Sequence, residues 1–394
     1  MQNTIYDVIT QQNLDHYFSF KHIPGCGKQL RPMNYVKNND SFDDAAITIR
    51  SMIYERMSFL LSNKTNTYAQ HILLSGGLDS CITLHCLRDC FKGRIISHTL
   101  NFTGTWQGKN TDLEYARKLS TRYKTEHHEH IVTSGEMLSD MTDILSLLKT
   151  PFSGVMSPYF ASKMLIPNTD VFTGDLSDEL FGSYKGPREA SLFTDISRED
   201  LLHWRSHLNG WMVFSKEEKE KLYSERFKSE VDLNSSLNLL KRWMPDTDDK
   251  VNAMLGLDWV STAPDQVFYS PQNLMTQNDL SPFMCPNLID YVTALPGEFK
   301  VYNGDVKFIL KKAFEDRIPS FVIEREKEGF VQPSNYWMKH CWEKEVRDTL
   351  SKPCYLFNPE YVNDLVLDYY AGNDSLQYKV WNLFCFMIWE TKIA

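Results

Sequence analysis

A glycine turn between a short apolar run and a segment of helical spacing most constrains how this chain can fold. Residues 71–75, HILLS, lead into Gly76-Gly77, and residues 78–90, LDSCITLHCLRDC, follow. We interpret these segments as a buried strand, a tight turn and a helix. Glycine lets a backbone approach a ligand closely, and the first N–H groups of a helix have no partner within it. The turn therefore predicts a cradle for an anion such as phosphate.

Two hydroxyls and one carboxylate accompany this turn. Ser75 and Ser80 add potential donors to the cradle, whereas the charge of Asp79 would repel an anion. The repulsion disappears if Asp79 binds Mg²⁺, because this ion bridges carboxylates and phosphates. The stretch lacks the spacing and the lysine of a G-x-x-x-x-G-K-[ST] loop. A Gly-Gly pair alone often marks only a turn, so the specific signal is the whole hexapeptide between strand and helix.

Strand-like and helix-like segments alternate around the turn. Strands are expected at residues 71–75, 94–102, 127–133 and 170–175, and helices at 45–62, 78–90 and 111–124. This alternation favours right-handed crossovers. It predicts an α/β fold, with a parallel sheet and flanking helices.

The sequence changes character after about residue 185 and becomes helical and rich in aromatic residues. Residues 215–231 are expected to form one charged, solvated helix. Residues 376–390 are expected to form a core helix that is too short to span a membrane. We divide the chain into an N-terminal helical segment (1–60), an α/β core (61–190) and a helical C-terminal lobe (191–394).

Composition excludes several classes of protein. Hydrophobic residues make up 42% and charged residues 24% of the chain, which is typical of globular proteins. The net charge of −9 and the lack of a basic stripe argue against a nucleic-acid partner. No long apolar stretch and no secretory signal are visible, so neither a membrane nor export is expected. The eight cysteines form no Cys-x-x-Cys pair and fit a reducing cytoplasm.

Two smaller clusters are given structural interpretations. Cys81, Cys86 and Cys90 lie on one predicted helix and are expected to be buried thiols. The histidine-rich stretch 127–130, HHEH, lies on a predicted strand, where alternate side chains face opposite sides. Three metal ligands therefore cannot converge within this stretch.

A second acidic constellation, residues 173–182 (TGDLSDELFG), follows the strand expected at 170–175. Loops at the carboxyl ends of parallel strands converge on one crevice, so Asp178 could meet Asp79 across a shared metal ion. The alternative is a helix N-terminus enriched in acids, each stabilised there by about 0.3–1 kcal/mol. The glycine turn favours the shared metal ion.

Taken in order, these motifs resemble the synthetase half of asparagine synthetases, which are PP-loop (N-type) ATP pyrophosphatases. The likeness is carried by SGGLDS at 75–80, TEHHE at 125–129 and GDLSDELFGSY at 174–184. A later stretch, Arg325-x-Lys327-x-Gly329-Phe330-x-x-Pro333, is similar to the basic loop of the family. The resemblance covers roughly residues 14–390.

The resemblance implies a PP-loop core and an AMP-forming amide ligase that uses ATP and Mg²⁺. A small-molecule carboxylate would attack the α-phosphate and release pyrophosphate, and a nitrogen donor would then displace AMP. It also implies that Asp79 and Asp178 bind the metal, and that Lys327, Asp175 and Glu179 are catalytic. The nucleotide-binding residues that it implies are Leu74, Ser75, Gly76, Gly77, Asp79, Ser80, Leu100, Phe102, Thr173 and Gly174.

The chain departs from the family where the family shapes its substrate side. Its Ser-Gly-Glu-Gly is here Thr173-Gly174-Asp175-Leu176, and its Asp-Glu-Pro is Lys149-Thr150-Pro151. Leu280 replaces the arginine before Pro-Phe, and Cys285 replaces the aspartate after it. A charge change at a buried site requires a changed partner, so these differences argue against aspartate as the substrate. The nucleotide side is intact.

Glutamine-dependent members of the family begin with the nucleophilic cysteine of a glutaminase domain. Here residue 2 is Gln2 and the first cysteine is Cys26, so this chain is not expected to hydrolyse glutamine. Its nitrogen would come from ammonia, an amine or a separate glutaminase subunit. An alternative function is a degenerate nucleotide-binding or partner-binding module without catalysis. A third is adenylation with a nucleic-acid acceptor, which the acidic net charge disfavours.

Overall fold

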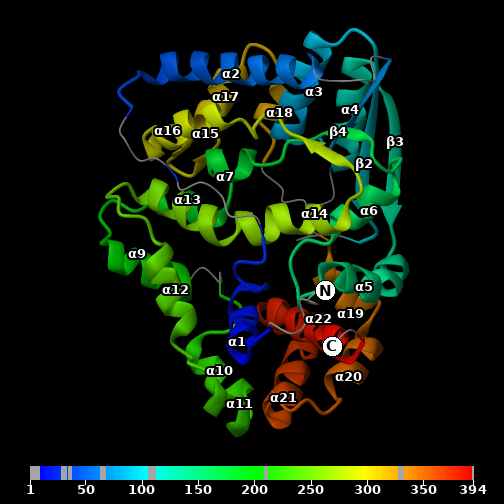
Figure 1. Ribbon diagram of the computed structural model, residues 1–394, viewed down its shortest axis with the longest axis vertical. Helices are drawn as coiled ribbons and strands as arrows, with labels where there is room; N and C mark the ends of the chain where they lie inside the picture. Colours follow the sequence, from blue (N-terminus) through cyan, green and yellow to red (C-terminus); the bar gives the residue numbers. More distant parts are fainter. Residues whose placement is uncertain are drawn as a thin grey trace, which may run out of the picture.

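The computed structural model, which describes residues 9–27, 33, 38–62, 68–104, 112–207, 212–326 and 332–392, contains a five-stranded parallel sheet. The strand order is β3-β2-β1-β4-β5, and all four pairings are parallel. Helices flank the sheet (Figure 1), which confirms the predicted α/β class. The strands are β1 (Ala69–Leu73), β2 (Arg94–Phe102), β3 (Glu126–Val132), β4 (Asp170–Phe172) and β5 (Asn278–Leu280).

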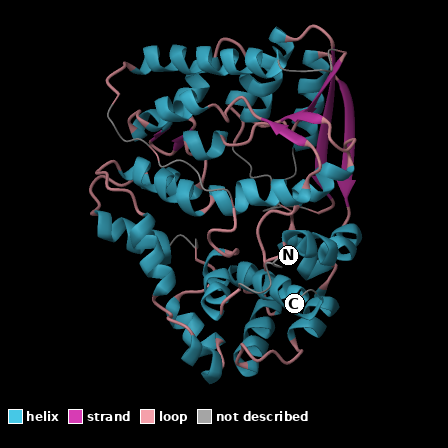
Figure 2. Cartoon of the chain, in the orientation of Figure 1, coloured by secondary structure: helices cyan, strands magenta, loops and turns pink. Residues whose placement is uncertain are grey.

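Helices make up most of the remaining structure, as Figure 2 shows. A short hairpin, β6 (Val301–Tyr302) with β7 (Asp305–Val306), lies among them. The helices are α1 (Gln11–Phe20), α2 (Phe42–Ser62), α3 (Leu78–Cys90), α4 (Asp112–Tyr123), α5 (Ser134–Leu148), α6 (Ser157–Lys163), α7 (Ser177–Phe181), α8 (Lys185–Ala190), α9 (Arg198–His207), α10 (Lys216–Leu222), α11 (Glu225–Glu230), α12 (Ser235–Trp243), α13 (Lys250–Ser261), the π-helix η2 (Ala263–Phe268), α14 (Tyr269–Leu274), α15 (Pro286–Thr293), α16 (Gly297–Lys300), α17 (Phe308–Phe314), α18 (Ser320–Ile323), α19 (Ser334–His340), α20 (Glu343–Leu350), α21 (Pro359–Tyr370), the 3₁₀-helix η3 (Asp374–Leu376) and α22 (Gln377–Lys392).

The elements predicted around the glycine turn are confirmed. The helix expected at 78–90 is α3, and the strand expected at 94–102 is β2, with the same bounds. The helix expected at 45–62 is α2, which begins earlier, at Phe42. β5 was not predicted, because three residues carry no alternating pattern. Its conformation comes from pairing with β4, from Asp170↔Asn278 to Phe172↔Leu280.

The charged segment 215–231 differs from the prediction of one solvated helix, which is wrong. The segment forms two short helices, α10 and α11, because Tyr223 is extended and pairs with Phe357 in an isolated β-bridge. The side chain of Ser224 then caps α11 by accepting from the N–H of Phe227. Lys219 is fully buried and ion-paired with Asp15, so not all of these charges are solvated.

One long helical stretch, α13–η2–α14, runs between the sheet-bearing half of the molecule and the half that holds α1 and α22 (Figure 1). α13 is buried along most of its length, as expected for a helix that is apolar on nearly all sides. Two large hydrophobic clusters lie in the molecule, one with Leu84 and Phe314 and the other with Trp381 and Phe386. The domain division near residue 190 stays a prediction.

Two smaller expectations concern the cysteines and the membrane. Cys81 and Cys86 are buried, but Cys90 is exposed, because it is the last residue of α3. The expectation that all three are buried is therefore wrong for Cys90. Among the described residues, no helix combines the length and the apolar character needed to cross a membrane.

Candidate active site

The two motifs meet at a change of direction in the sheet. The chain runs from β1 outward to β2 and β3, and then returns on the other side of β1 as β4. β1 and β4 are direct neighbours, with His71 opposite Val171 and Ile72 opposite Phe172. In open α/β sheets, ligands bind in the crevice at the carboxyl ends of such a strand pair. Residues 74–77 and 173–176 form the loops at these two ends.

The glycine turn after β1 has a conformation and a packing that only glycine allows. Gly76 has φ +76°, and a Cβ atom there would lie 2.7 Å from Cβ of Tyr115 and 2.8 Å from the backbone nitrogen of Ala116. Gly77 is the N-cap of α3 and offers no side-chain cap to its first turn. The Oγ atoms of Ser75 and Ser80 lie 3.1 Å apart beside this turn. Uncapped N–H groups and two hydroxyls therefore gather at the end of β1.

Asp79 and Asp178 converge on the ammonium group of one lysine. Nζ of Lys307 lies 2.5 Å from Oδ2 of Asp79 and is also ion-paired with Oδ1 of Asp178. The hydroxyl of Ser177 donates to Oδ1 of Asp79 over 2.6 Å. The aspartates lie in the first turns of α3 and α7, 17% and 26% exposed, whereas Lys307 is 2% exposed. The structure thus brings the two carboxylates together around a cation that belongs to the chain.

Sequence reasoning missed Lys307. It follows the β6–β7 hairpin, whose Asn303-Gly304 turn has φ +48° and +80°. Lys307 is itself left-handed, with φ +55°, and is the N-cap of α17. The helix dipole disfavours a cation at a helix N-terminus, so a lysine at this position needs anionic partners. The signal that the sequence offered is this lysine at the end of a short hairpin with an Asn-Gly turn.

The loop after β4 is packed tightly against α3. A Cβ atom on Gly174 would lie 2.7 Å from Cβ of Asp79 and 3.1 Å from the nitrogen of Ser80. The hydroxyl of Thr83 donates to the carbonyl of Thr173 over 3.1 Å and joins the helix to the loop. Gly174 therefore fixes how closely the two motifs approach.

Three further carboxyl groups belong to this loop or to the elements that adjoin it. Burial raises the pKa of Asp175, and the carboxylate of Asp279 on β5 raises it further. Burial also raises the pKa of Asp279, although the Thr173 hydroxyl, 2.6 Å from its Oδ1, opposes the effect. Burial and the charge of Asp178 raise the pKa of Glu179 to about 7. Asp279 was missed because β5 was missed.

Three of the residues implied to bind the nucleotide, Leu74, Leu100 and Phe102, are buried. Leu74 is 1% exposed and continues the β1 pairing, since its N–H donates to the carbonyl of His98. Leu100 and Phe102 are 5% and 6% exposed, and the ring of Phe102 packs edge-on against Trp337. Their role beside a nucleotide stays a prediction.

Lys327 lies outside the described residues, but the start of its loop is anchored beside the glycine turn. Arg325 donates to Oδ1 of Asp112 over 2.6 Å, and its guanidinium lies 4.3 Å from the ring centroid of Tyr115. Tyr115 is the residue that Gly76 approaches most closely. Arg325, near the end of the described residues that precede this loop, is therefore held against α4 next to the glycine turn.

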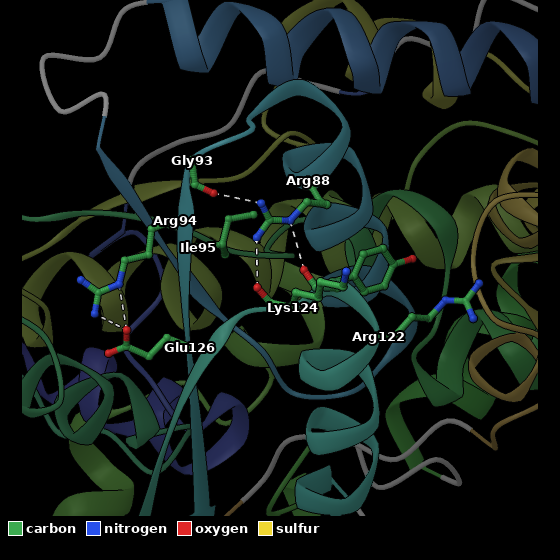
Figure 3. A pocket seen from close by; sticks show the side chains of 8 residues that line it. Arg88, Gly93, Arg94, Ile95, Arg122, Lys124 and Glu126 are labelled. Carbon is green, nitrogen blue, oxygen red and sulfur yellow. Dashed lines mark hydrogen bonds and ion pairs between the residues drawn. The ribbon is translucent and has the colours of Figure 1, made fainter.

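A cavity of about 400 Å³ lies at the other end of the sheet, near the starts of β2 and β3. Four cationic side chains line it, yet they do not converge (Figure 3). Arg88 donates to the carbonyls of Gly93 and Tyr123, Arg94 pairs with Glu126, and Arg122 points away from the others. Arg88 thus satisfies backbone carbonyls, and this cavity lies away from the carboxyl ends of β1 and β4.

Comparisons with known proteins agree with the motifs. The family described as "Asparagine synthase" matches residues 71–391. The chain is 23% identical to glutamine-hydrolyzing asparagine synthetase 1 of Bacillus subtilis (strain 168), over 97% of this chain and 69% of that protein. It is 23% identical to synthetase 3 of the same strain and 25% identical to the enzyme of Gallus gallus. It spans 49% of the length of each of these two.

The NH3-dependent NAD synthetase from Campylobacter jejuni subsp. jejuni NCTC 11168 aligns over 92% of its chain with 55% of this one. The identity is 16% and the TM-score 0.26, too low to support a structural comparison. The family match instead covers most of this chain, from the middle of β1 to α22. The chain therefore belongs to the asparagine synthase family.

Proposed function

We propose that this chain is an ATP-dependent, AMP-forming amide ligase. The observation that carries the proposal is the meeting of Asp79 and Asp178 beside an uncapped glycine turn, at the carboxyl ends of β1 and β4. This arrangement joins a phosphate cradle to a pair of carboxylates that already hold a positive charge. Both are needed when pyrophosphate leaves ATP as the carboxylate becomes adenylated, because negative charge builds up on the pyrophosphate oxygens.

The residues present fit a magnesium ion. Asp79, Asp178 and the Ser177 hydroxyl are oxygen donors, and Mg²⁺ is usually held by one or two carboxylates together with phosphates and water. The described residues include no group of three His, Cys, Asp or Glu suited to a metal, so phosphate and water would complete the shell. When bound, the ion would offset the charge of the departing pyrophosphate.

The remaining roles follow from position. The first-turn N–H groups of α3 and the hydroxyls of Ser75 and Ser80 would bind the pyrophosphate oxygens. Lys327 would add a positive charge against the phosphates. Asp175 and Glu179 are proposed as the catalytic carboxylates that handle the proton lost by the attacking nitrogen.

The acceptor is proposed to be a small-molecule carboxylate other than aspartate. The position before Pro-Phe that is arginine in the family is Leu280, and its neighbour Asp279 faces Asp175. An acidic wall suits a cationic or neutral substrate group better than a second carboxylate. Ammonia, an amine or a separate glutaminase subunit is proposed as the nitrogen source.

The direct test is ATP–pyrophosphate exchange, screened over small carboxylic acids with Mg²⁺ present. We expect exchange with one or a few acids, and its loss in Asp79→Asn because the metal site then lacks half of its charge. Asp43→Asn is the matched control, since Asp43 is an exposed aspartate in the first turn of α2. Full exchange in Asp79→Asn would reject the metal role.

One observation favours the alternative of a nucleotide-binding module without catalysis. Lys307 already neutralises part of the charge of Asp79 and Asp178. Under this alternative, ATP binds but no carboxylic acid supports exchange. Trapping an acyl-adenylate and identifying it by mass spectrometry would decide for the ligase and name its substrate.

A further inference from the structure

The ammonium group of Lys307 lies between Asp79 and Asp178, where a metal ion shared by the two carboxylates would lie. Its Nζ contacts Asp79 on α3 and Asp178 on α7, two helices that follow different strands. Its backbone N–H donates to the carbonyl of Phe181 over 3.3 Å, so the main chain of Lys307 is tied to the end of α7 as well. The side chain is therefore held at the pair from two directions.

This ion pair is not explained by the stability of its helices. Each aspartate lies in the first turn of a helix, where the dipole already favours a negative charge. Lys307 begins α17, where the dipole opposes a positive charge, and its backbone is in the left-handed region that lysine disfavours. Both features are unfavourable locally, and only the meeting of two carboxylates compensates for them.

The two aspartates stay accessible although the lysine does not. Their side chains are 17% and 26% exposed, while that of Lys307 is 2% exposed. A solvent-borne ion can therefore approach the carboxylates, but it meets an ammonium group between them. The charge of Lys307 repels a divalent cation and competes with it for the same oxygens.

We propose that Lys307 competes with the divalent cation for Asp79 and Asp178, and that the cation and the polyphosphate together release its ammonium group from the pair. Lys307 is in this sense a positioning residue, which keeps the carboxylates together before the ligands arrive. The inference deepens the proposed function and rests on it for the identity of the polyphosphate.

The test is Mn²⁺ binding to the full chain without nucleotide, measured by electron paramagnetic resonance. Lys307→Met removes the charge at nearly constant volume, and we expect Mn²⁺ to bind about tenfold tighter or more, since the competitor is gone. Lys307→Arg keeps the charge and should bind Mn²⁺ as the wild type does. Lys311→Met is the matched control on the same helix, because Lys311 pairs with Asp305 instead.

A second variant ties the effect to the aspartates. Adding Asp79→Asn to Lys307→Met should abolish the gain in Mn²⁺ affinity. Circular dichroism confirms that each variant is folded, and Lys307→Gln replaces the methionine variant if that one does not fold. Unchanged or weaker Mn²⁺ binding in a folded, uncharged variant would overturn the proposal.

The two proposals can fail separately. If no carboxylic acid supports ATP–pyrophosphate exchange but Lys307→Met gains Mn²⁺ affinity, the ligase function is rejected and the competition stands. If exchange occurs and Mn²⁺ affinity does not change, the ligase stands and Lys307 is only a structural ion pair.

Discussion

Gly174 shows how one missing side chain sets the geometry of the candidate site. The loop after β4 passes so close to α3 that a Cβ atom on Gly174 would lie 2.7 Å from Cβ of Asp79. Thr83 holds the same two segments together through its hydroxyl. The position of the Asp79 carboxylate therefore depends on a residue that has no functional group.

Gly174→Ala should displace Asp79 from Ser177 and Lys307. We expect a loss of about 1–3 kcal/mol in the free energy of unfolding, because the added methyl overpacks a filled space. ATP–pyrophosphate exchange should fall with it, beyond the effect on stability. Gly135→Ala is the control, since its Cβ would meet nothing closer than 3.9 Å on helix α5, and it should stabilise by about 0.5–1 kcal/mol. Equal effects of the two substitutions in urea unfolding would contradict this reading.

At the scale of elements, a buried polar network fixes α1, α10 and α12 against one another. Nζ of Lys219 on α10 lies 2.7 Å from Oδ1 of Asp15 and donates to Ser19, both on α1, and to Ser236 on α12. Tyr223 also donates to Oδ1 of Asp15, over 3.0 Å. The network explains why α10 ends where it does, since Tyr223 must turn inward to reach Asp15.

Lys219→Met should destabilise the protein by about 3–5 kcal/mol, because it leaves the carboxylate of Asp15 buried without its cation. Lys221→Met on the same helix is exposed and should change stability by no more than about 0.5 kcal/mol. Denaturant midpoints of the two variants measure the difference. A loss below about 1 kcal/mol for Lys219→Met would show that the network is not a determinant of stability.

At the scale of the whole molecule, a row of three histidines, of which His98 is buried, links the stability of the sheet to pH. His71, His98 and His128 lie on the neighbouring strands β1, β2 and β3, with ring centroids 5.2 Å and 5.5 Å apart. Nδ1 of His71 lies 3.0 Å from Nε2 of His98. Burial and three neighbouring histidines, His71, His128 and His127, lower the pKa of His98 to about 4, and the nearby carboxylate of Glu126 opposes this only weakly.

The sign of the pH effect follows from this lowered pKa. The unfolded chain takes up a proton on His98 near pH 6.5 and the folded protein only near pH 4, so the unfolded state binds more protons in between. The contribution of neutral, buried His98 to the free energy of unfolding is complete above about pH 6.5 and is lost as pH falls towards 4. We expect the thermal midpoint to drop across this range, and to drop less in His98→Gln. The exposed His203→Gln should follow the wild type, whereas an identical pH profile for His98→Gln would contradict the prediction.

The sequence by itself determined the parts of this protein that are local. Residues 69–102 contain their own strand, turn, helix and strand signals, so β1, α3 and β2 could be predicted together with the glycine turn. The order of the two acidic motifs also predicted that Asp79 and Asp178 meet. The two aspartates come together because parallel strands joined by right-handed crossovers place the loops at their carboxyl ends side by side. Both features can be inferred from the alternation of strand and helix segments.

Only the tertiary structure decided which cation lies between the two aspartates and which carboxylate faces Asp175. Lys307 comes from a hairpin more than a hundred residues beyond Asp178, and Asp279 lies on a three-residue strand with no pattern of its own. The burial of Lys219 likewise depends on α1, which lies near the start of the chain. Such pairs form because a charge that packing removes from water is costly unless it is paired with an opposite charge. Which residues pair depends on how the distant elements pack, and this cannot be inferred from their separation along the chain.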